Sequence, residues 1–163
     1  MFDQKTLALA ETVLRECRSR GWRIATAESC TGGLVAAALT AIPGASAVVE
    51  RGFVVYSNDA KKELLGVTQA TLTTHGAVSA EAASAMATGA IERAKVDLAV
   101  AIVGVAGPDG GSPEKPVGLV HFAIATRNGQ RTQRQIFPGN RTEVRQAALV
   151  FALQSLIAGA RGI

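Results

Sequence analysis

Hydrophobic positions follow two patterns along this chain. In residues 2–20, Leu7, Val13, Leu14 and Cys17 recur at helical spacing and would form one apolar face. Residues 98–103 are continuously apolar, which is typical of a strand covered on both faces. The two patterns, with their capping and turn residues, predict further helices over 34–41, 60–65, 68–74, 79–95 and 141–158, and further strands over 22–27, 48–56, 117–125 and 131–137.

The order of these elements predicts the fold class. Helices and strands alternate in the first part of the chain, which is typical of parallel strands joined by helices. Near the end, Asn128-Gly129 lies between two strand segments and indicates an antiparallel hairpin. Val54 and Val55 are both apolar, so we expect the strand over 48–56 to be covered on both faces as well. We predict an α/β protein, a three-layer α/β/α sandwich with a mixed sheet, forming a single domain over residues 1–163.

Composition and charge exclude several classes of function. Hydrophobic residues make up 48% of the chain and aromatic residues only 4%, so small aliphatic side chains must build the core. The net charge of +4 comes from scattered Lys and Arg, which argues against nucleic-acid binding and favours a small anionic ligand. Neither a signal peptide nor a membrane-spanning stretch is visible, and Cys17 and Cys30 form no CxxC pair. We therefore expect a cytoplasmic protein without a metal site; small apolar helices are compatible with a homodimer.

Three segments that follow predicted strands are rich in polar residues or glycine. They are residues 28–33, 56–61 and 104–116. Because ligands of open α/β sheets bind beyond the carboxyl ends of the strands, we expect these segments to converge on one site.

The first of these segments offers a nucleophile. Ser29 is either the N-cap of the following helix or a nucleophile at the positive end of that helix. In the second case, backbone N–H groups of Cys30, Thr31 or Gly32 would bind an oxyanion or a phosphate, and Gly33 would complete the turn. The segment matches neither a GxSxG elbow nor a phosphate-binding P-loop. Cys30 remains a rival nucleophile, because a thiolate at a helix N-terminus would be activated.

The second segment offers a base. Lys61 is either a surface residue or a lysine whose pKa is lowered by burial and by its place near a helix start, which would let it act as a general base. Its neighbour Lys62 is the solvated comparison.

Other candidates are weaker. The glycine-rich third segment, with Gly107, is either a plain connection or a backbone wall close to a flat ligand. Arg141 and Arg145 lie one helical turn apart and would either hold a phosphate or face solvent. His75 and His121 are interpreted as structural, although His75 would be near the border of a site.

Several ordered motifs together resemble the CinA C-terminal domain family. They are TAESCTGG at residues 26–33, GxxxYSNxxK at 52–61 with LLGV at 64–67, HGAVS at 75–79, GxAGP at 104–108 and GSPEKPVG at 111–118. The family's enzymes are nicotinamide-nucleotide amidases. The resemblance implies an α/β/α fold and hydrolysis of nicotinamide mononucleotide to nicotinate mononucleotide and ammonia, in pyridine-nucleotide salvage, with no metal or organic cofactor.

The resemblance also assigns residues. The family's serine nucleophile falls on Ser29, its lysine on Lys61 and its site tyrosine on Tyr56, with Asn58 at the polar position between them. Family members often have glycine where Asp109 stands, which adds a carboxylate near the expected anion site. Two alternatives stay open: a non-catalytic nucleotide-binding module of a competence or DNA-damage response, and a metal-dependent phosphohydrolase, against which the absence of paired carboxylates counts.

Overall fold

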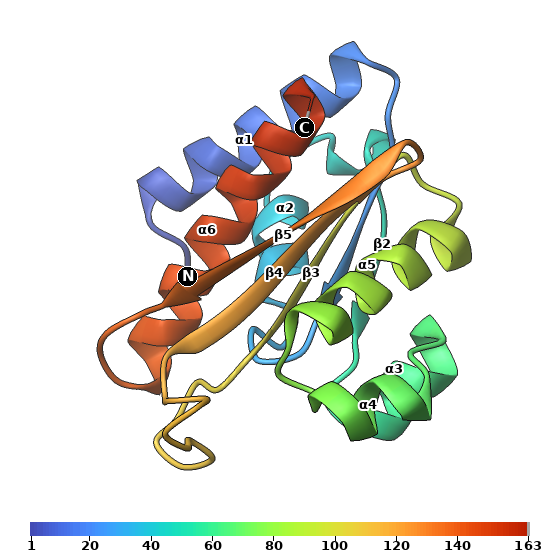
Figure 1. Ribbon diagram of the computed structural model, residues 1–163. Coiled ribbons are helices and arrows are strands. Elements are labelled where there is room, and N and C mark those ends of the chain that lie inside the picture. The colour runs from blue at the N-terminus through green and yellow to red at the C-terminus, as the bar shows by residue number, and fades with distance from the viewer. Residues whose placement is uncertain (163) are drawn as a thin grey trace.

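A computed structural model describes residues 1–162, and Ile163, the last position of the predicted domain, lies outside the described residues. A five-stranded sheet has the order β2-β1-β3-β4-β5 (Figure 1). The first three strands are parallel to one another, whereas β4 and β5 are antiparallel, so the predicted mixed sheet is confirmed. The strands are β1 (Ile24–Glu28), β2 (Val49–Val54), β3 (Leu98–Gly104), β4 (Leu119–Thr126) and β5 (Gly129–Ile136).

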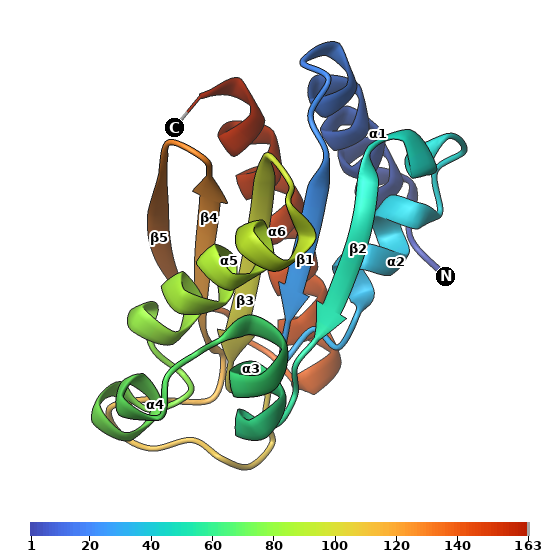
Figure 2. The same cartoon turned by 90° about the vertical axis from the view of Figure 1, so that its right-hand side faces the viewer.

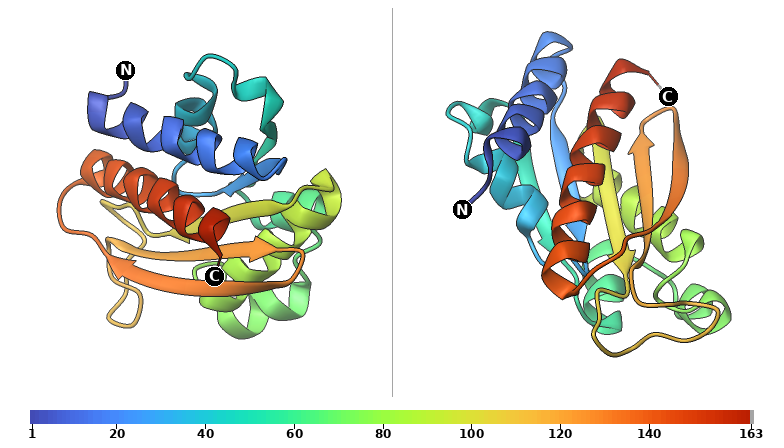
Figure 3. Two further views of the ribbon diagram at one scale, coloured as in Figure 1. Left: turned by 90° about the horizontal axis from the view of Figure 1, so that it is seen from above. Right: turned by 90° about the vertical axis from the view of Figure 1, so that its left-hand side faces the viewer.

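Helices cover both faces of this sheet, which confirms the three-layer architecture (Figure 3). One layer contains α1 (Gln4–Ser19), α2 (Leu34–Thr40) and α6 (Arg141–Arg161). The other contains α5 (Ala80–Ala94), against which α3 (Asn58–Leu65) and α4 (Gln69–His75) pack. A short 3-10 helix, η1 (Ala45–Ala47), precedes β2 and was not predicted, because three residues after Pro43-Gly44 carry no periodic pattern.

The prediction that the strand over 48–56 is covered on both faces is wrong. It forms the edge strand β2, which ends at Val54, and the Val54 side chain remains 51% exposed. The continuously apolar β3 is by contrast buried from Leu98 to Val103, because it lies inside the sheet between β1 and β4. Consecutive apolar residues alone did not distinguish these two positions in the sheet.

A glycine on α5, Gly89, allows α3 to pack very closely against α5. Gly89 faces the end of α3, and a Cβ atom at this position would overlap the carbonyl oxygen of Leu65. The backbones of α3 and α5 therefore approach each other more closely than any larger residue at position 89 would permit. This approach fixes the position of α3 beyond the end of β2.

The described residues lack two features that bear on the predicted functions. Within residues 1–162, no helix is both long and apolar enough to cross a membrane. The same residues contain no group of three His, Cys, Asp or Glu side chains arranged to hold a metal ion.

Candidate active site

The carboxyl ends of the three parallel strands surround one small pocket. Figure 2 shows β1, β2 and β3 ending on the side of the molecule where α3 and α4 lie. Among the three parallel strands, the middle one, β1, is followed by α2 on one face of the sheet, whereas α5 precedes β3 on the other face. The carboxyl ends of these strands are therefore the switch point where α/β proteins bind ligands. The strand-end pocket measures about 200 Å³ and is lined by Ser29, Cys30, Tyr56, Asn58, Lys61, Ala77, Val78, Val103, Gly104, Ala106 and Arg141.

Ser29 and Lys61 meet inside this pocket. Ser29 directly follows β1, and Lys61 lies on α3 beyond the end of β2. Their side chains are only 7% and 2% exposed, and Lys61 Nζ lies 3.3 Å from Ser29 Oγ. Lys61 Nζ also donates to the carbonyl oxygens of Val55 at 3.0 Å and Tyr56 at 3.1 Å, with the Ser57 carbonyl farther away at 3.5 Å. The interpretation of Lys61 as a surface residue is therefore wrong.

Burial of Lys61 disfavours the charged form of its amine. Burial lowers the pKa of Lys61, against a smaller opposing effect of the neighbouring Cys30 thiol. No ion pair within residues 1–162 includes Lys61, whereas Lys62 pairs with Asp59 at 2.8 Å on the surface. A neutral amine has two N–H groups, and the two shorter carbonyl contacts would use both. Its lone pair is then left for the Ser29 hydroxyl.

Glu28, and not Ser29, caps the helix that follows β1. Gly33, at φ +96°, occupies the N-cap position of α2, so the N-cap interpretation of Ser29 is wrong. Glu28 is fully buried and accepts a hydrogen bond from the Thr26 hydroxyl at 3.1 Å. It also accepts three backbone hydrogen bonds at 2.9–3.1 Å, from the N–H groups of Gly33, Val35 and Ala36. Nothing in the sequence signals this role, because a carboxylate five residues before the N-cap matches no usual capping pattern.

The backbone N–H groups after Ser29 differ in their availability. The N–H group of Gly32 donates to the carbonyl oxygen of Ser29 at 3.1 Å, so the expectation that it is free to bind an oxyanion is wrong. No carbonyl oxygen in the described part of the chain accepts from the N–H groups of Cys30 or Thr31. These two groups are the remaining oxyanion donors among those expected from the sequence.

Cys30 lies next to Ser29, but burial keeps its thiol protonated. Its side chain is 5% exposed, and burial is the main cause that raises the pKa of its thiol to about 12. Backbone N–H groups of Cys30 and Thr31 oppose this effect without cancelling it. At neutral pH the thiol is therefore protonated, which argues against Cys30 as the nucleophile.

Tyr56, Asn58 and Arg141 lie at the mouth of the pocket. The Tyr56 side chain is 62% exposed, and its hydroxyl accepts a hydrogen bond from Arg141 Nη2 at 3.1 Å. Arg141 Nη1 donates to the carbonyl oxygen of Gly107 at 2.8 Å. Asn58 is exposed at the start of α3, directly after its N-cap Ser57. From the third segment, Gly104 and Ala106 line the pocket, whereas Gly107, the residue expected there, does not.

Arg145 does not line the pocket. Its Nε donates to the carbonyl oxygen of Cys30 at 3.1 Å and its Nη2 to that of Thr31 at 3.0 Å. The alternative in which Arg145 simply faces solvent is therefore wrong, and the residue is not placed to hold a phosphate in the pocket. His75 and His121 also lie outside the lining, with His75 Nδ1 3.5 Å from Glu81.

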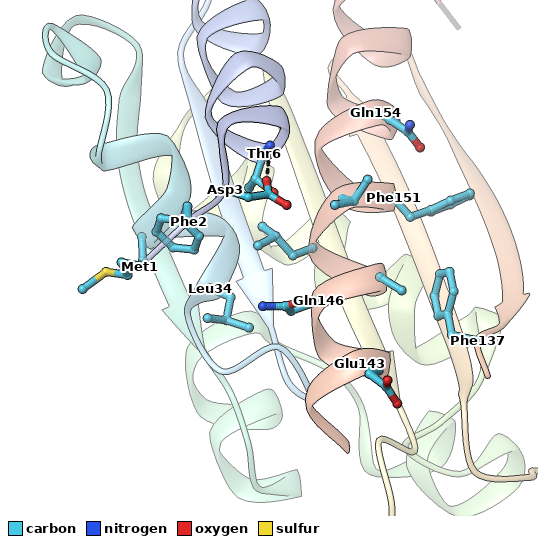
Figure 4. Close-up of a pocket in the computed structure, with 14 residues that line it drawn as sticks. Met1, Phe2, Asp3, Thr6, Leu34, Phe137, Glu143, Gln146, Phe151 and Gln154 are labelled. Atoms are coloured by element: carbon cyan, nitrogen blue, oxygen red, sulfur yellow. Dashed lines mark hydrogen bonds between the residues drawn. The ribbon is translucent and has the colours of Figure 1, made fainter. Parts of the chain in front are cut away.

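A larger hollow lies in the layer formed by α1, α2 and α6. The apolar groove, as we call it, measures about 610 Å³ and runs between the N-terminal segment, α2 and α6 (Figure 4). Its two acidic residues serve as caps: Asp3 accepts from Thr6 N at the start of α1, and Glu143 belongs to the capping box of α6. The residues lining it are Met1, Phe2, Asp3, Thr6, Leu34, Ala37, Phe137, Glu143, Gln146, Ala147, Leu149, Val150, Phe151 and Gln154.

Comparisons with known proteins agree with this architecture. The nicotinamide-nucleotide amidohydrolase PncC of Escherichia coli K12 is 52% identical over 157 residues, which cover 96% of this chain and 95% of that protein. The protein of the same name from Enterobacter agglomerans is 48% identical and covers 96% of each chain. The crystal structure of the competence/damage inducible protein CihA from Agrobacterium tumefaciens matches with a TM-score of 0.95 at 51% identity, over 97% of both chains.

The resemblance expected from the sequence motifs is confirmed at the level of the family. The model of the CinA C-terminal domain matches residues 6–159, which include all the segments that form the strand-end pocket. Sequence, architecture and the position of the pocket lead to one assignment: the chain belongs to the CinA C-terminal domain family.

Proposed function

We propose that this protein hydrolyses the carboxamide of nicotinamide mononucleotide to nicotinate mononucleotide and ammonia, with Ser29 as the nucleophile and Lys61 as its base. The observation that carries the proposal is the 3.3 Å contact between Lys61 Nζ and Ser29 Oγ in a buried pocket. Relatives that match nearly the whole chain are named nicotinamide-nucleotide amidohydrolases, which supplies the substrate class.

The reaction would proceed through an ester of the serine. Neutral Lys61 takes the proton of the Ser29 hydroxyl while Oγ attacks the carboxamide carbon, forming a tetrahedral intermediate. The C–N bond then breaks, and the proton held by Lys61 leaves with the nitrogen as ammonia. A water molecule, activated by the same amine, hydrolyses the resulting acyl-enzyme and restores the serine hydroxyl. The balance is one amide and one water giving one carboxylic acid and one ammonia.

Burial of the dyad supports this chemistry. Lys61 is only 2% exposed, and burial lowers its pKa, so its neutral form, which carries the lone pair, is more accessible than that of an exposed lysine. The N–H groups of Cys30 and Thr31 are the donors proposed for the developing oxyanion. In other enzymes such a donor contributes about 3 kcal/mol to transition-state stabilisation.

The size of the pocket suggests how the substrate would bind. Ligand pockets usually measure roughly 300–1,000 Å³, so a volume of about 200 Å³ suits the pyridine ring with its carboxamide better than a whole nucleotide. The ribose and phosphate would extend through the mouth, past Tyr56 and Asn58. Arg141 supplies a positive charge there for the phosphate.

A direct assay tests the proposal. Purified protein is incubated with nicotinamide mononucleotide in the presence of a chelator, and ammonia and nicotinate mononucleotide are quantified over time. We expect both products in equal amounts, and none from the Ser29→Ala variant. Binding without ammonia release would instead support the non-catalytic nucleotide-binding module, and turnover that requires added metal would support a phosphohydrolase. A cytoplasmic location and a homodimer remain predictions from the sequence.

A further inference from the structure

Arg145 holds the loop that follows the nucleophile, and we propose that it serves the reaction as a positioning residue without touching the substrate. The inference rests on the function proposed above. It assigns a role to a residue that sequence analysis associated with the phosphate, and it separates Arg145 from Arg141, one helical turn earlier on α6.

Two successive peptide groups depend on this guanidinium. Arg145 Nε and Nη2 donate to the carbonyl oxygens of Cys30 and Thr31 at 3.1 and 3.0 Å, across 115 and 114 positions of sequence. A guanidinium presents several N–H groups in one rigid plane, which suits two acceptors side by side, whereas the ammonium of a lysine is a single point. Gly32 lies beside the group, since a Cβ atom there would be in van der Waals contact with Arg145 Nη2 at 3.4 Å.

Because the peptide bond is planar, holding a carbonyl group also fixes the direction of the N–H group on the opposite side of the loop. In a trans peptide the carbonyl of one residue and the N–H of the next point in opposite directions. Holding the Cys30 carbonyl therefore turns the Thr31 N–H, a proposed oxyanion donor, away from Arg145. Holding the Thr31 carbonyl does the same for the Gly32 N–H, which donates to the carbonyl oxygen of Ser29. A cation on the carbonyl also polarises the peptide and strengthens its N–H as a donor.

Glu28 fixes the far end of the same loop. Its buried carboxylate accepts from the N–H groups of Gly33, Val35 and Ala36. The loop after Ser29 is thus held between an anion that binds N–H groups and a cation that binds carbonyl groups. Both charges are directed at the backbone, and neither residue lines the strand-end pocket.

Conservative variants of the two arginines test the inference. We measure kcat and KM for Arg145→Lys and Arg141→Lys, with nicotinamide mononucleotide and with nicotinamide riboside, which lacks the phosphate. For Arg145→Lys we expect kcat to fall about tenfold or more with both substrates while KM stays within about threefold, because an interaction of the transition state is weakened. For Arg141→Lys we expect the main effect in KM, and only for the nucleotide.

A result in which Arg145→Lys raises KM for the nucleotide alone, with kcat intact, would overturn the inference and make Arg145 a phosphate ligand. In Arg145→Ala, added guanidinium ion should restore part of kcat, which a general loss of packing would not allow. Arg145→Gln serves as the second variant if Arg145→Lys does not fold, with thermal unfolding of each variant measured alongside. If Ser29→Ala keeps its turnover, the proposed nucleophile fails; if Ser29→Ala is inactive and Arg145→Lys has normal kcat, only this inference fails.

Discussion

Two hollows in the described part of the chain, the strand-end pocket and the apolar groove, differ both in size and in chemistry. The strand-end pocket measures about 200 Å³ and contains a buried amine beside a buried hydroxyl. The apolar groove measures about 610 Å³, but its acidic residues are engaged as helix caps. Volume depends on how closely neighbouring helices pack, whereas reactive groups accumulate where parallel strands end and their side chains and loops converge. For this fold, the smaller hollow is the better candidate.

The largest expected effect separates the two hollows by activity. Ser29→Ala and Lys61→Ala should each lower kcat/KM for nicotinamide mononucleotide about 1,000-fold or more, because nucleophile and base act as a unit. Steady-state ammonia release measures this, and Lys62→Ala, one residue away on the surface, is the matched control with nearly unchanged kinetics. Near-normal turnover of Ser29→Ala would show that another group is the nucleophile.

The pH dependence follows from the charge of Lys61. Its pKa is lowered from the ordinary 10.5 by burial, and only the neutral amine can accept the Ser29 proton. As the pH falls through this lowered pKa, kcat/KM should fall about tenfold per unit. A profile of kcat/KM from pH 5 to 10, with the protein's folding monitored at each pH, would show this decrease on the acidic side. A flat profile across this range would contradict the role of Lys61 as base.

The lowered pKa of Lys61 should also make the free energy of unfolding rise with pH. The unfolded chain has the higher lysine pKa, so between the two values it binds more protons than the folded protein, and stability rises with pH there. Urea unfolding of the wild type at several pH values measures this slope, and Lys61→Met should lose it. An unchanged slope in the variant would mean that another group titrates.

A substitution in the apolar groove should affect stability but not chemistry. Phe151 packs on Phe122, with ring centroids 4.6 Å apart, and is half-buried beside the groove. Phe151→Ala should lower the free energy of unfolding by about 2–3 kcal/mol, because aromatic contacts and buried area are lost. Below the unfolding transition, kcat should match that of the wild type. A loss of kcat with intact folding would reveal a functional link between the two hollows.

The smallest effect is expected inside the strand-end pocket itself. Cys30→Ala removes a thiol that is protonated at neutral pH, so kcat should change by less than about fivefold. The measurement is the same ammonia assay, compared with Ser29→Ala. If Cys30→Ala abolished turnover while Ser29→Ala did not, the assignments of the two neighbouring residues would have to be exchanged.

The convergence of the three loop segments was predictable from the sequence. Ser29 follows β1 and Lys61 lies beyond β2, and the rule for strand ends places both at one edge of the sheet. Their direct contact was an expectation that the resemblance to the family supported. The geometry agrees with that expectation at 3.3 Å.

The support of the site was not predictable in the same way. Arg145 binds carbonyl oxygens more than a hundred positions away, and Glu28 binds N–H groups of its own following helix. Any residue type supplies a backbone carbonyl or N–H, so neither contact leaves a pattern in the sequence. The exposure of Val54 was missed for a related reason, because position in the sheet depends on topology that local hydrophobicity does not record.

The close approach at Gly89 has a consequence for how this activity can be lost. Leu65, whose carbonyl oxygen faces Gly89, lies one helical turn after Lys61 on α3. A methyl group added at position 89 would displace α3 as a body and carry the amine away from the serine. Gly89, which has no side chain and lies outside the pocket, thereby limits how far Lys61 Nζ and Ser29 Oγ can separate. A harmful variant at this position would retain the side chains of Ser29 and Lys61 and would only increase the distance between them.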